Sequence, residues 1–260
     1  MPLYTADALI LRTYKLGEAD RIVVFLTSDR GKRRGVAKGA RRTRSRFSGG
    51  LEPFTRVRLA YFERENRDLV RLSYTEPVVS PLVGQAAALT QVEYFAELMD
   101  AWAPEADPSE RLYRLGASVI DAIAANVPVE ALARYFEYWL LRLQGVYPSI
   151  MTCNRCGKTL AQKGAVLASN HGVFVCWNCA SGNYELKLSA EALGFLQAVS
   201  KLGADQLSDL SLAPPAARQL AEVHRQLITM QLEREPRSTR VLRELGSSMD
   251  RVETERSSMP

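Results

Sequence analysis

The spacing of apolar residues changes near residue 80, and this change limits the fold more than any other feature of the sequence. Before it, apolar residues occur in short runs that are β-branched, as in Arg21–Thr27, or alternate with polar residues, as in Arg56–Phe62 and Leu69–Thr75, which are the patterns of strands. After it, they recur at steps of three and four, as between Leu89 and Trp102, which is the pattern of amphipathic helices. The sequence therefore predicts an α+β protein whose β part precedes its helical part.

The segment up to residue 80 contains about five strand-like runs separated by turn-like sequence. The runs are Ala6–Tyr14, Arg21–Thr27, Lys32–Ala37, Arg56–Phe62 and Leu69–Thr75. Five short strands suit a small closed barrel, because closure removes exposed sheet edges. We expect an oligonucleotide-binding (OB) barrel, and a five-stranded SH3-like barrel is the alternative. Only the connection over residues 39–53 is long.

The helical part has the pattern of a bundle whose apolar stripes pack a core. Helical periodicity covers Leu112–Ile123, Leu132–Leu143, Ala190–Lys201 and Ala216–Glu233, and prolines fall between the earlier segments, where helices break. We expect a multidomain chain: an OB domain (1–80), a helical bundle domain (81–150 and 185–235), an inserted four-cysteine zinc module (151–184) and a disordered polar tail (236–260). One helical turn near Val241–Leu245 is expected in the tail.

No stretch of the sequence approaches the roughly 20 apolar residues that a membrane span needs. The first residues show no basic region followed by an apolar run, so we expect no signal peptide and a cytoplasmic protein. In that compartment the four cysteines are thiols or metal ligands, not structural disulfides.

Two Cys-x-x-Cys pairs form the sharpest chemical signal in the sequence. They are Cys153 with Cys156 and Cys176 with Cys179, and residues 157–175 separate the pairs, a spacing typical of a four-cysteine zinc site. Each pair brings two sulfurs to one side of a tight turn, and two such turns make the tetrahedral cage that Zn²⁺ prefers. We expect one zinc ion in a structural role, because four sulfurs leave no open position for substrate. Two reduced pairs without metal, or an iron–sulfur cluster, are the alternatives.

Other chemistry finds little support in the sequence. Neither pair lies in the βαβ pattern of a thioredoxin-like redox motif, and His171 lacks the His-x-Glu context of a nucleobase deaminase. For His171 and His224, surface or packing roles are expected. There is no phosphate-binding Gly-Lys-Ser/Thr loop, nucleophile elbow, dinucleotide fingerprint or metal-binding carboxylate cluster. We therefore expect a protein that is not an enzyme.

Positive charge is concentrated near the N-terminus. Residues 1–80 hold 17 of the 34 Lys and Arg but only 9 of the 29 Asp and Glu, which leaves 17 cations and 20 carboxylates for the rest. Between Gly31 and Gly50 there is no carboxylate. The cations of that stretch are Lys32, Arg33, Arg34, Lys38, Arg41, Arg42, Arg44 and Arg46.

A cationic loop on a small barrel predicts binding of a single-stranded nucleic acid. The cations follow phosphates and aromatic side chains stack on bases, and guanidinium groups also bind phosphate in a bidentate manner. A solubilising loop is the alternative. Phe47 is expected to be exposed, because Arg46 and Ser48 flank it in a loop, and it is predicted to contact the nucleic acid together with the eight cations. Tyr61 is expected in the barrel core, and Phe54 is a second candidate for stacking.

Several stretches of the sequence resemble the RecO family of bacterial DNA repair and recombination mediators. They are "LGEADRIVVFLTSDRGKRRGVAKGARRTRSRF" followed by "GGLEPF", and "FEYWLLRLQGVYPSI" running into "CNRCGK". The resemblance covers about residues 1–235. Some members of that family lack the four cysteines.

The resemblance implies an N-terminal OB barrel, a helical domain and an inserted zinc module. It also implies binding of single- and double-stranded DNA, annealing of complementary strands, and a role in the RecF pathway at the nucleoid. The implied partners are RecR, the C-terminal tail of single-stranded DNA-binding protein (SSB) and, indirectly, RecA, which would be loaded on SSB-coated gaps. The implied DNA contacts are Lys38, Arg41, Arg42, Arg44 and Arg46, and the implied zinc ligands are the four cysteines. A zinc-ribbon and OB protein that binds RNA is the alternative function.

Overall fold

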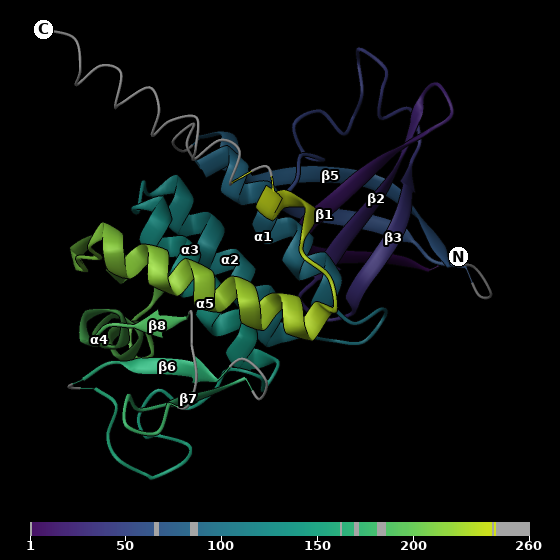
Figure 1. Cartoon of the computed structure of the whole chain (residues 1–260). Coiled ribbons are helices and arrows are strands. Elements are labelled where there is room, and N and C mark those ends of the chain that lie inside the picture. The colour runs from purple at the N-terminus through teal and green to yellow at the C-terminus, as the bar shows by residue number, and fades with distance from the viewer. Residues whose placement is uncertain are drawn as a thin grey trace, which may run out of the picture. The chain divides into compact units, whose positions relative to one another are not determined.

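The computed structural model describes residues 2–64, 68–83, 88–161, 163–168, 172–180, 186–240 and 242. The chain forms two compact units (Figure 1). Unit 1 comprises Met1–Gly116 and the segment from Glu235 on, and unit 2 comprises Ala117–Arg234. None of the helices in the described ranges is long and apolar enough to cross a membrane.

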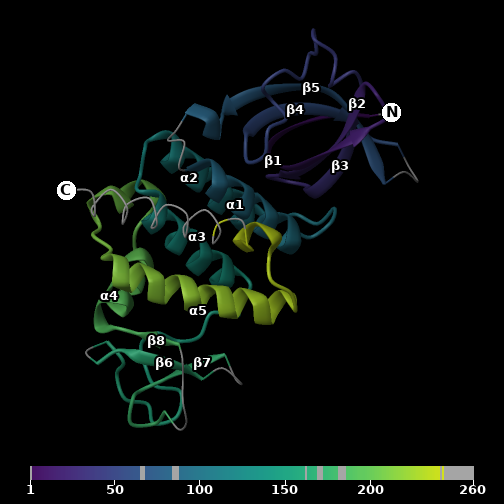
Figure 2. The same ribbon diagram turned by 45° about the horizontal axis from the view of Figure 1, so that its top comes forward.

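Unit 1 contains a closed barrel of five strands in the order β1-β2-β3-β5-β4, with β4 returning to β1. The strands are β1 (Leu3–Leu16), β2 (Asp20–Thr27), β3 (Gly31–Ala37), β4 (Arg56–Phe62) and β5 (Leu69–Val79). The β3–β5 pair is parallel, and the other described pairs of the barrel are antiparallel. In both views the strands curve around a common interior (Figure 2). This is the predicted OB arrangement.

The alternation of apolar residues determines which side chains fill the barrel. Val57, Leu59 and Tyr61 of β4 are completely buried, because side chains at every second position point to the same face of a strand. They join a core cluster to which β1, β2, β3 and β5 also contribute. Gly35 allows β3 to approach β5, since a Cβ atom there would lie 2.9 Å from Cγ2 of Val70.

Helix α1 (Ala88–Trp102) belongs to unit 1 and packs on β1. Phe54 closes the barrel toward it, with its ring centroid 5.7 Å from that of Phe95. The backbone of Phe54 is left-handed, with φ of 59°, and it is held by a hydrogen bond from its N–H to the Ile10 carbonyl at 2.6 Å. That pairing lies beside the irregularity in β1 between Ile10 and Arg12.

The remaining helical elements include a short 3₁₀ turn η1 (Pro81–Val83) and α2 (Glu110–Ala124), which crosses the boundary between the units. Unit 2 contains α3 (Val129–Leu143), α4 (Ala190–Val199), the 3₁₀ turn η2 (Ala204–Asp209) and α5 (Pro214–Leu232). These elements confirm the helical periods of the sequence. The division of the chain into separate domains at residues 80, 150, 184 and 235 stays a prediction.

A small antiparallel sheet completes unit 2. Its strands are β6 (Ala165–Ala168), β7 (Val173–Val175) and β8 (Lys187–Leu188), in the order β7-β6-β8. Both views place α5 between α3 and this sheet (Figures 1 and 2). Between α3 and α5, His224 has hydrogen-bonding partners on both ring nitrogens, Tyr147 at 2.8 Å and Glu137 at 2.8 Å. His224 therefore has the packing role expected of it, whereas His171 lies outside the described residues.

The start of the expected tail is held on unit 1. Pro236 is buried, and residues 237–240 begin a helical turn. The Glu97 carboxylate of α1 accepts hydrogen bonds from the backbone N–H groups of Arg237 at 3.0 Å and Ser238 at 2.9 Å, and from the Ser238 hydroxyl at 2.7 Å. The prediction of disorder from residue 236 is therefore wrong for residues 236–240. Residues 241 and 243–260 lie outside the described ranges, as does most of the turn expected near Val241–Leu245.

Candidate nucleic-acid interface and metal centre

The basic stretch begins on β3, where its first cation is buried. Lys32 Nζ donates to the Asp100 carbonyl at 2.7 Å and lies 3.4 Å from a carboxylate oxygen of Asp100 and 3.4 Å from one of Glu105. Its side chain is only 8% exposed. Lys32 is therefore a weaker candidate for a DNA contact than the exposed cations, because its charge is already paired inside unit 1.

The next two cations of β3 also have carboxylate partners. Arg33 lies 3.0 Å from a carboxylate oxygen of Glu63, and Arg34 lies 2.9 Å from one of Glu105. Arg34 remains more than half exposed. An internal carboxylate competes with a phosphate for the same guanidinium donors, so these two arginines are weaker candidates than the loop cations.

The cations after β3 lie on the surface of the barrel. The five are Lys38, Arg41, Arg42, Arg44 and Arg46, and all are exposed. In the described ranges no carboxylate lies within ion-pair distance of any of them. We call these five residues the basic loop. Their charges are available to a polyanion.

The basic loop is anchored to the turn between β1 and β2. The Asp20 carboxylate accepts a hydrogen bond from the Gly39 N–H at 2.8 Å, and the Ala19 carbonyl accepts one from the Arg41 N–H at 2.9 Å. The Arg41 guanidinium also donates to the carbonyls of Gly17 and Glu18. These bonds give the loop a defined path, which reduces the entropy that it loses on meeting a ligand.

Phe47 lies inside the barrel. Its side chain is 2% exposed and belongs to the barrel core, so the prediction that it is exposed is wrong, and a buried ring is a poor candidate for stacking on a base. The physical reason is that the open end of a small barrel must be covered by apolar groups, and the long β3–β4 connection supplies Phe47 and Leu51 for this purpose. Phe54 is buried as well, and Tyr61 is in the core as expected.

A groove beside the basic loop contains residues that the sequence did not single out. It has a volume of about 480 Å³, and its lining includes Lys38, Phe62, Arg64 and Arg71. Arg71 enters it because the barrel closes, with Arg71 opposite Val36 on β3 and opposite Phe62 on β4. No local signal marks Arg71, since it occupies an ordinary polar position of an alternating strand.

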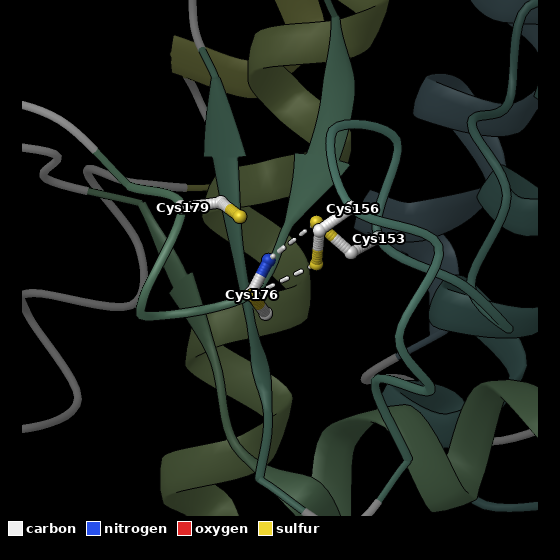
Figure 3. Close-up of side chains that lie close together, drawn as sticks. All are labelled: Cys153, Cys156, Cys176 and Cys179. Atoms are coloured by element: carbon white, nitrogen blue, oxygen red, sulfur yellow. Dashed lines mark hydrogen bonds between the residues drawn. The ribbon is translucent and has the colours of Figure 1, made fainter.

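The four cysteines converge in unit 2, with their sulfurs all within 4.8 Å of one another (Figure 3). Cys156 and Cys176, from different pairs, bring their sulfurs to 3.7 Å. A tetrahedral zinc with Zn–S bonds of about 2.3 Å needs sulfurs roughly 3.8 Å apart. The donor set and its spacing therefore fit a four-sulfur metal site.

Each cysteine pair forms a tight turn that its backbone stabilises. The Gly157 N–H donates to the Cys153 carbonyl at 2.9 Å, and the Cys179 N–H donates to the Cys176 carbonyl at 3.0 Å. Gly157 has φ of 72°, a conformation that favours glycine. The Arg155 guanidinium joins the turns by donating to the Cys179 carbonyl at 2.8 Å.

The surroundings of two of the cysteines shift the pKa values of their thiols in opposite directions. Burial raises the pKa of Cys153, but backbone N–H donors from Cys176, Cys156 and Arg155 outweigh it and lower the pKa to about 6. Hydrogen bonds with Cys156 and Cys176 raise the pKa of Cys179 to about 12. The Cys153 and Cys179 thiols therefore differ in acidity, and a bound metal ion would supply positive charge that favours the thiolate form of its ligands.

Comparison with known proteins identifies the family. A family model described as "Recombination protein O N terminal" matches residues 1–81, and one described as "Recombination protein O C terminal" matches residues 84–240. The chain belongs to the RecO family. The junction between the two RecO matches falls where the apolar period of the sequence changes.

Curated relatives named DNA repair protein RecO agree with this assignment. The one from Anaeromyxobacter sp. (strain K) is 33% identical over 241 residues, which cover 92% of this chain and 95% of that protein. Those from Koribacter versatilis and Bifidobacterium adolescentis are 37% and 39% identical over 163 and 167 residues. These matches cover 61% and 62% of this chain and 65% and 67% of those RecO proteins.

Proposed function

We propose that this chain is a DNA-binding recombination mediator without catalytic activity of its own. The observation that carries the proposal is the basic loop on an OB barrel, five exposed cations with no carboxylate partner among the residues that the structure describes. Such a surface holds the backbone of a nucleic acid by phosphate contacts and counterion release. Membership of the RecO family, with relatives named DNA repair proteins, supports DNA as the ligand.

Membership of the RecO family supports a finer role, which is part of the same proposal. The chain binds single- and double-stranded DNA, anneals complementary strands in the RecF pathway, and helps RecA load on SSB-coated gaps at the nucleoid in the cytoplasm. Annealing needs a surface that binds strands without reading their bases, and contacts to the phosphate backbone carry no sequence information. RecR and the C-terminal tail of SSB are the proposed protein partners.

The first test measures affinity for a single-stranded oligonucleotide against salt concentration. Changing Arg41, Arg42, Arg44 and Arg46 together to Gln should flatten the log–log slope by about 0.7 for each phosphate that the variant no longer neutralises. A matched control changes four exposed cations elsewhere, Arg111, Arg114, Lys201 and Arg218, and should leave the slope unchanged. Equal slopes for wild-type protein and the loop variant would contradict the proposal.

Competition between DNA and RNA of equal length separates the proposal from its alternative. A recombination mediator should retain single-stranded DNA against an equal concentration of RNA. Preference for structured RNA would favour an OB and zinc-ribbon factor that acts on RNA. Retention of an immobilised SSB C-terminal peptide would add specific support, because a generic basic barrel has no reason to retain that peptide.

We also propose that the four cysteines hold one structural zinc ion. Four sulfur donors suit Zn²⁺, and a closed set leaves no position for a reacting group. Metal analysis of reduced, freshly purified protein should give about one zinc per chain, and Cys156→Ser should lower it. Iron in place of zinc, with the visible absorption of an iron–sulfur cluster, would contradict this assignment.

A further inference from the structure

Trp177 lies in the turn between Cys176 and Cys179 and is 42% exposed, although it is a large apolar side chain. It is nevertheless held in a fixed orientation. Its indole N–H donates to the Lys163 carbonyl, and Lys187 on β8 places its ammonium group 5.4 Å from the ring centroid. An exposed indole with both a hydrogen bond and a cation over its ring loses little further freedom when a ligand binds.

The backbone around Trp177 is also shaped to fit the ring. Gly164 has φ of 83°, and a Cβ atom there would collide with the Leu188 carbonyl oxygen and lie 3.3 Å from the indole nitrogen of Trp177. Any larger residue would displace the strand or the ring. The turn before β6 therefore presents the indole at the surface as part of its own packing.

The part of the chain around the cysteine turns is rich in positive charge. Arg155, Lys158, Lys163 and Lys187 are exposed, and within residues 151–188 the sequence has one carboxylate, Glu185. The Arg155 guanidinium donates to the Cys179 carbonyl, next to the four cysteines, and its positive charge would offset the negative charge of a metal site with four thiolates. The lysines make no ion pair in the described part of the chain, so metal compensation does not account for all of the positive charge.

We propose that Trp177 and the neighbouring Lys163 and Lys187 form a second contact for single-stranded DNA, outside the barrel. Trp177 stacks on one unpaired base while the two ammonium groups meet adjacent phosphates. A single strand fits better than a duplex, because only an unstacked base offers its face to the indole. The choice of DNA rests on the proposed function, whereas the arrangement of ring and cations does not.

The direct test uses Trp177 as its own reporter. The chain has three tryptophans, and the Trp102→Phe/Trp139→Phe variant leaves Trp177 as the sole indole. Titration with oligo(dT) should quench its emission in a saturable way and in step with binding measured by anisotropy of a labelled strand. Bound oligonucleotide with unchanged emission would overturn the proposal.

A second set of variants keeps the test decisive if that double variant does not fold. Trp177→Ala should weaken binding of a long oligonucleotide by about fivefold or more, and Trp177→Phe should retain most of the affinity. Met151→Ala is the control, because it removes another exposed apolar side chain (56%) near the cysteine turns, and it should leave the affinity for the oligonucleotide unchanged. Lys163→Gln/Lys187→Gln should flatten the salt slope by about 1.4.

Zinc content is measured for each variant, and an effect of Trp177→Ala that disappears when zinc content is equalised would overturn the proposal.

The outcomes separate this proposal from the function it rests on. If the loop variant loses binding while every Trp177 variant binds as wild type, the second contact is wrong and the proposed function stands. If the loop variant binds as wild type, the proposed function fails by itself. An acidic peptide that quenches Trp177 when oligo(dT) does not would identify the surface as a protein contact and overturn the DNA assignment.

Discussion

Phe47 shows how one residue can follow a run of cations and still serve the core. Its ring packs with Leu51 in the barrel interior, and Arg46 places its guanidinium carbon 5.0 Å from the ring centroid. Phe47→Ala should lower the free energy of unfolding by about 3–5 kcal/mol, because it removes a buried aromatic ring and leaves a cavity. Denaturant unfolding measures this, and Phe47→Leu, which keeps most of the volume, should lose less. A variant with normal stability and weakened DNA binding would instead make Phe47 a base contact.

At the scale of elements, α3 and α5 are joined by a buried polar network. Burial lowers the pKa of His224, against the opposing hydrogen bond and charge of Glu137, while Arg134 of α3 also lowers it. Arg134 lies 3.0 Å from Glu137, and Tyr147 is the other neighbour of the imidazole. The neutral imidazole therefore donates from Nδ1 to Glu137 and accepts at Nε2 from the Tyr147 hydroxyl.

This network predicts a pH dependence of stability. The unfolded state binds a proton at His224 below a pH of about 6.5, whereas the folded state resists it, so the free energy of unfolding should fall as pH decreases below that value. The slope should approach about 1.4 kcal/mol per pH unit until the lowered folded pKa is reached. Urea unfolding between pH 5 and 7.5 measures it. His224→Gln should remove this contribution, and Tyr147→Phe should keep it.

The contact between Glu97 of α1 and the segment after Glu235 leads to a prediction about local opening of that segment. Burial raises the pKa of Glu97, but the bonds from Ser238 and Arg237 outweigh it and hold the pKa below its usual value. Glu97→Gln should speed hydrogen exchange at the Arg237 and Ser238 amides, because it should lower the free energy of local opening there by about 1–3 kcal/mol. Ser238→Ala, which removes one of the three bonds, should have a smaller effect. Unchanged exchange at both amides would show that the carboxylate does not hold the segment.

For the whole molecule, the division into two units predicts a local response to metal removal. All four cysteines belong to unit 2, and the barrel contributes none of the sulfur ligands. Chelation under reducing conditions should therefore remove exchange protection at the Gly157, Cys179 and Ala180 amides, which depend on the cysteine turns, because metal binding and folding of such turns are coupled. Amides of β1–β5 should keep their protection. Equal deprotection of the barrel would contradict independent units.

The sequence by itself determined the features that depend on neighbours along the chain. Alternating and β-branched apolar runs indicated the strands, helical periods indicated the helices, and the spacing of Cys153, Cys156, Cys176 and Cys179 indicated the metal centre, because each is a local pattern. The tertiary structure decided which charges stay free and which aromatics reach solvent. Lys32 meets Asp100 and Glu105 only after the long intervening chain has folded back, and Arg71 enters the groove only when the barrel closes. Pairing between such distant residues depends on the path of the chain between them, and no local pattern carries that information.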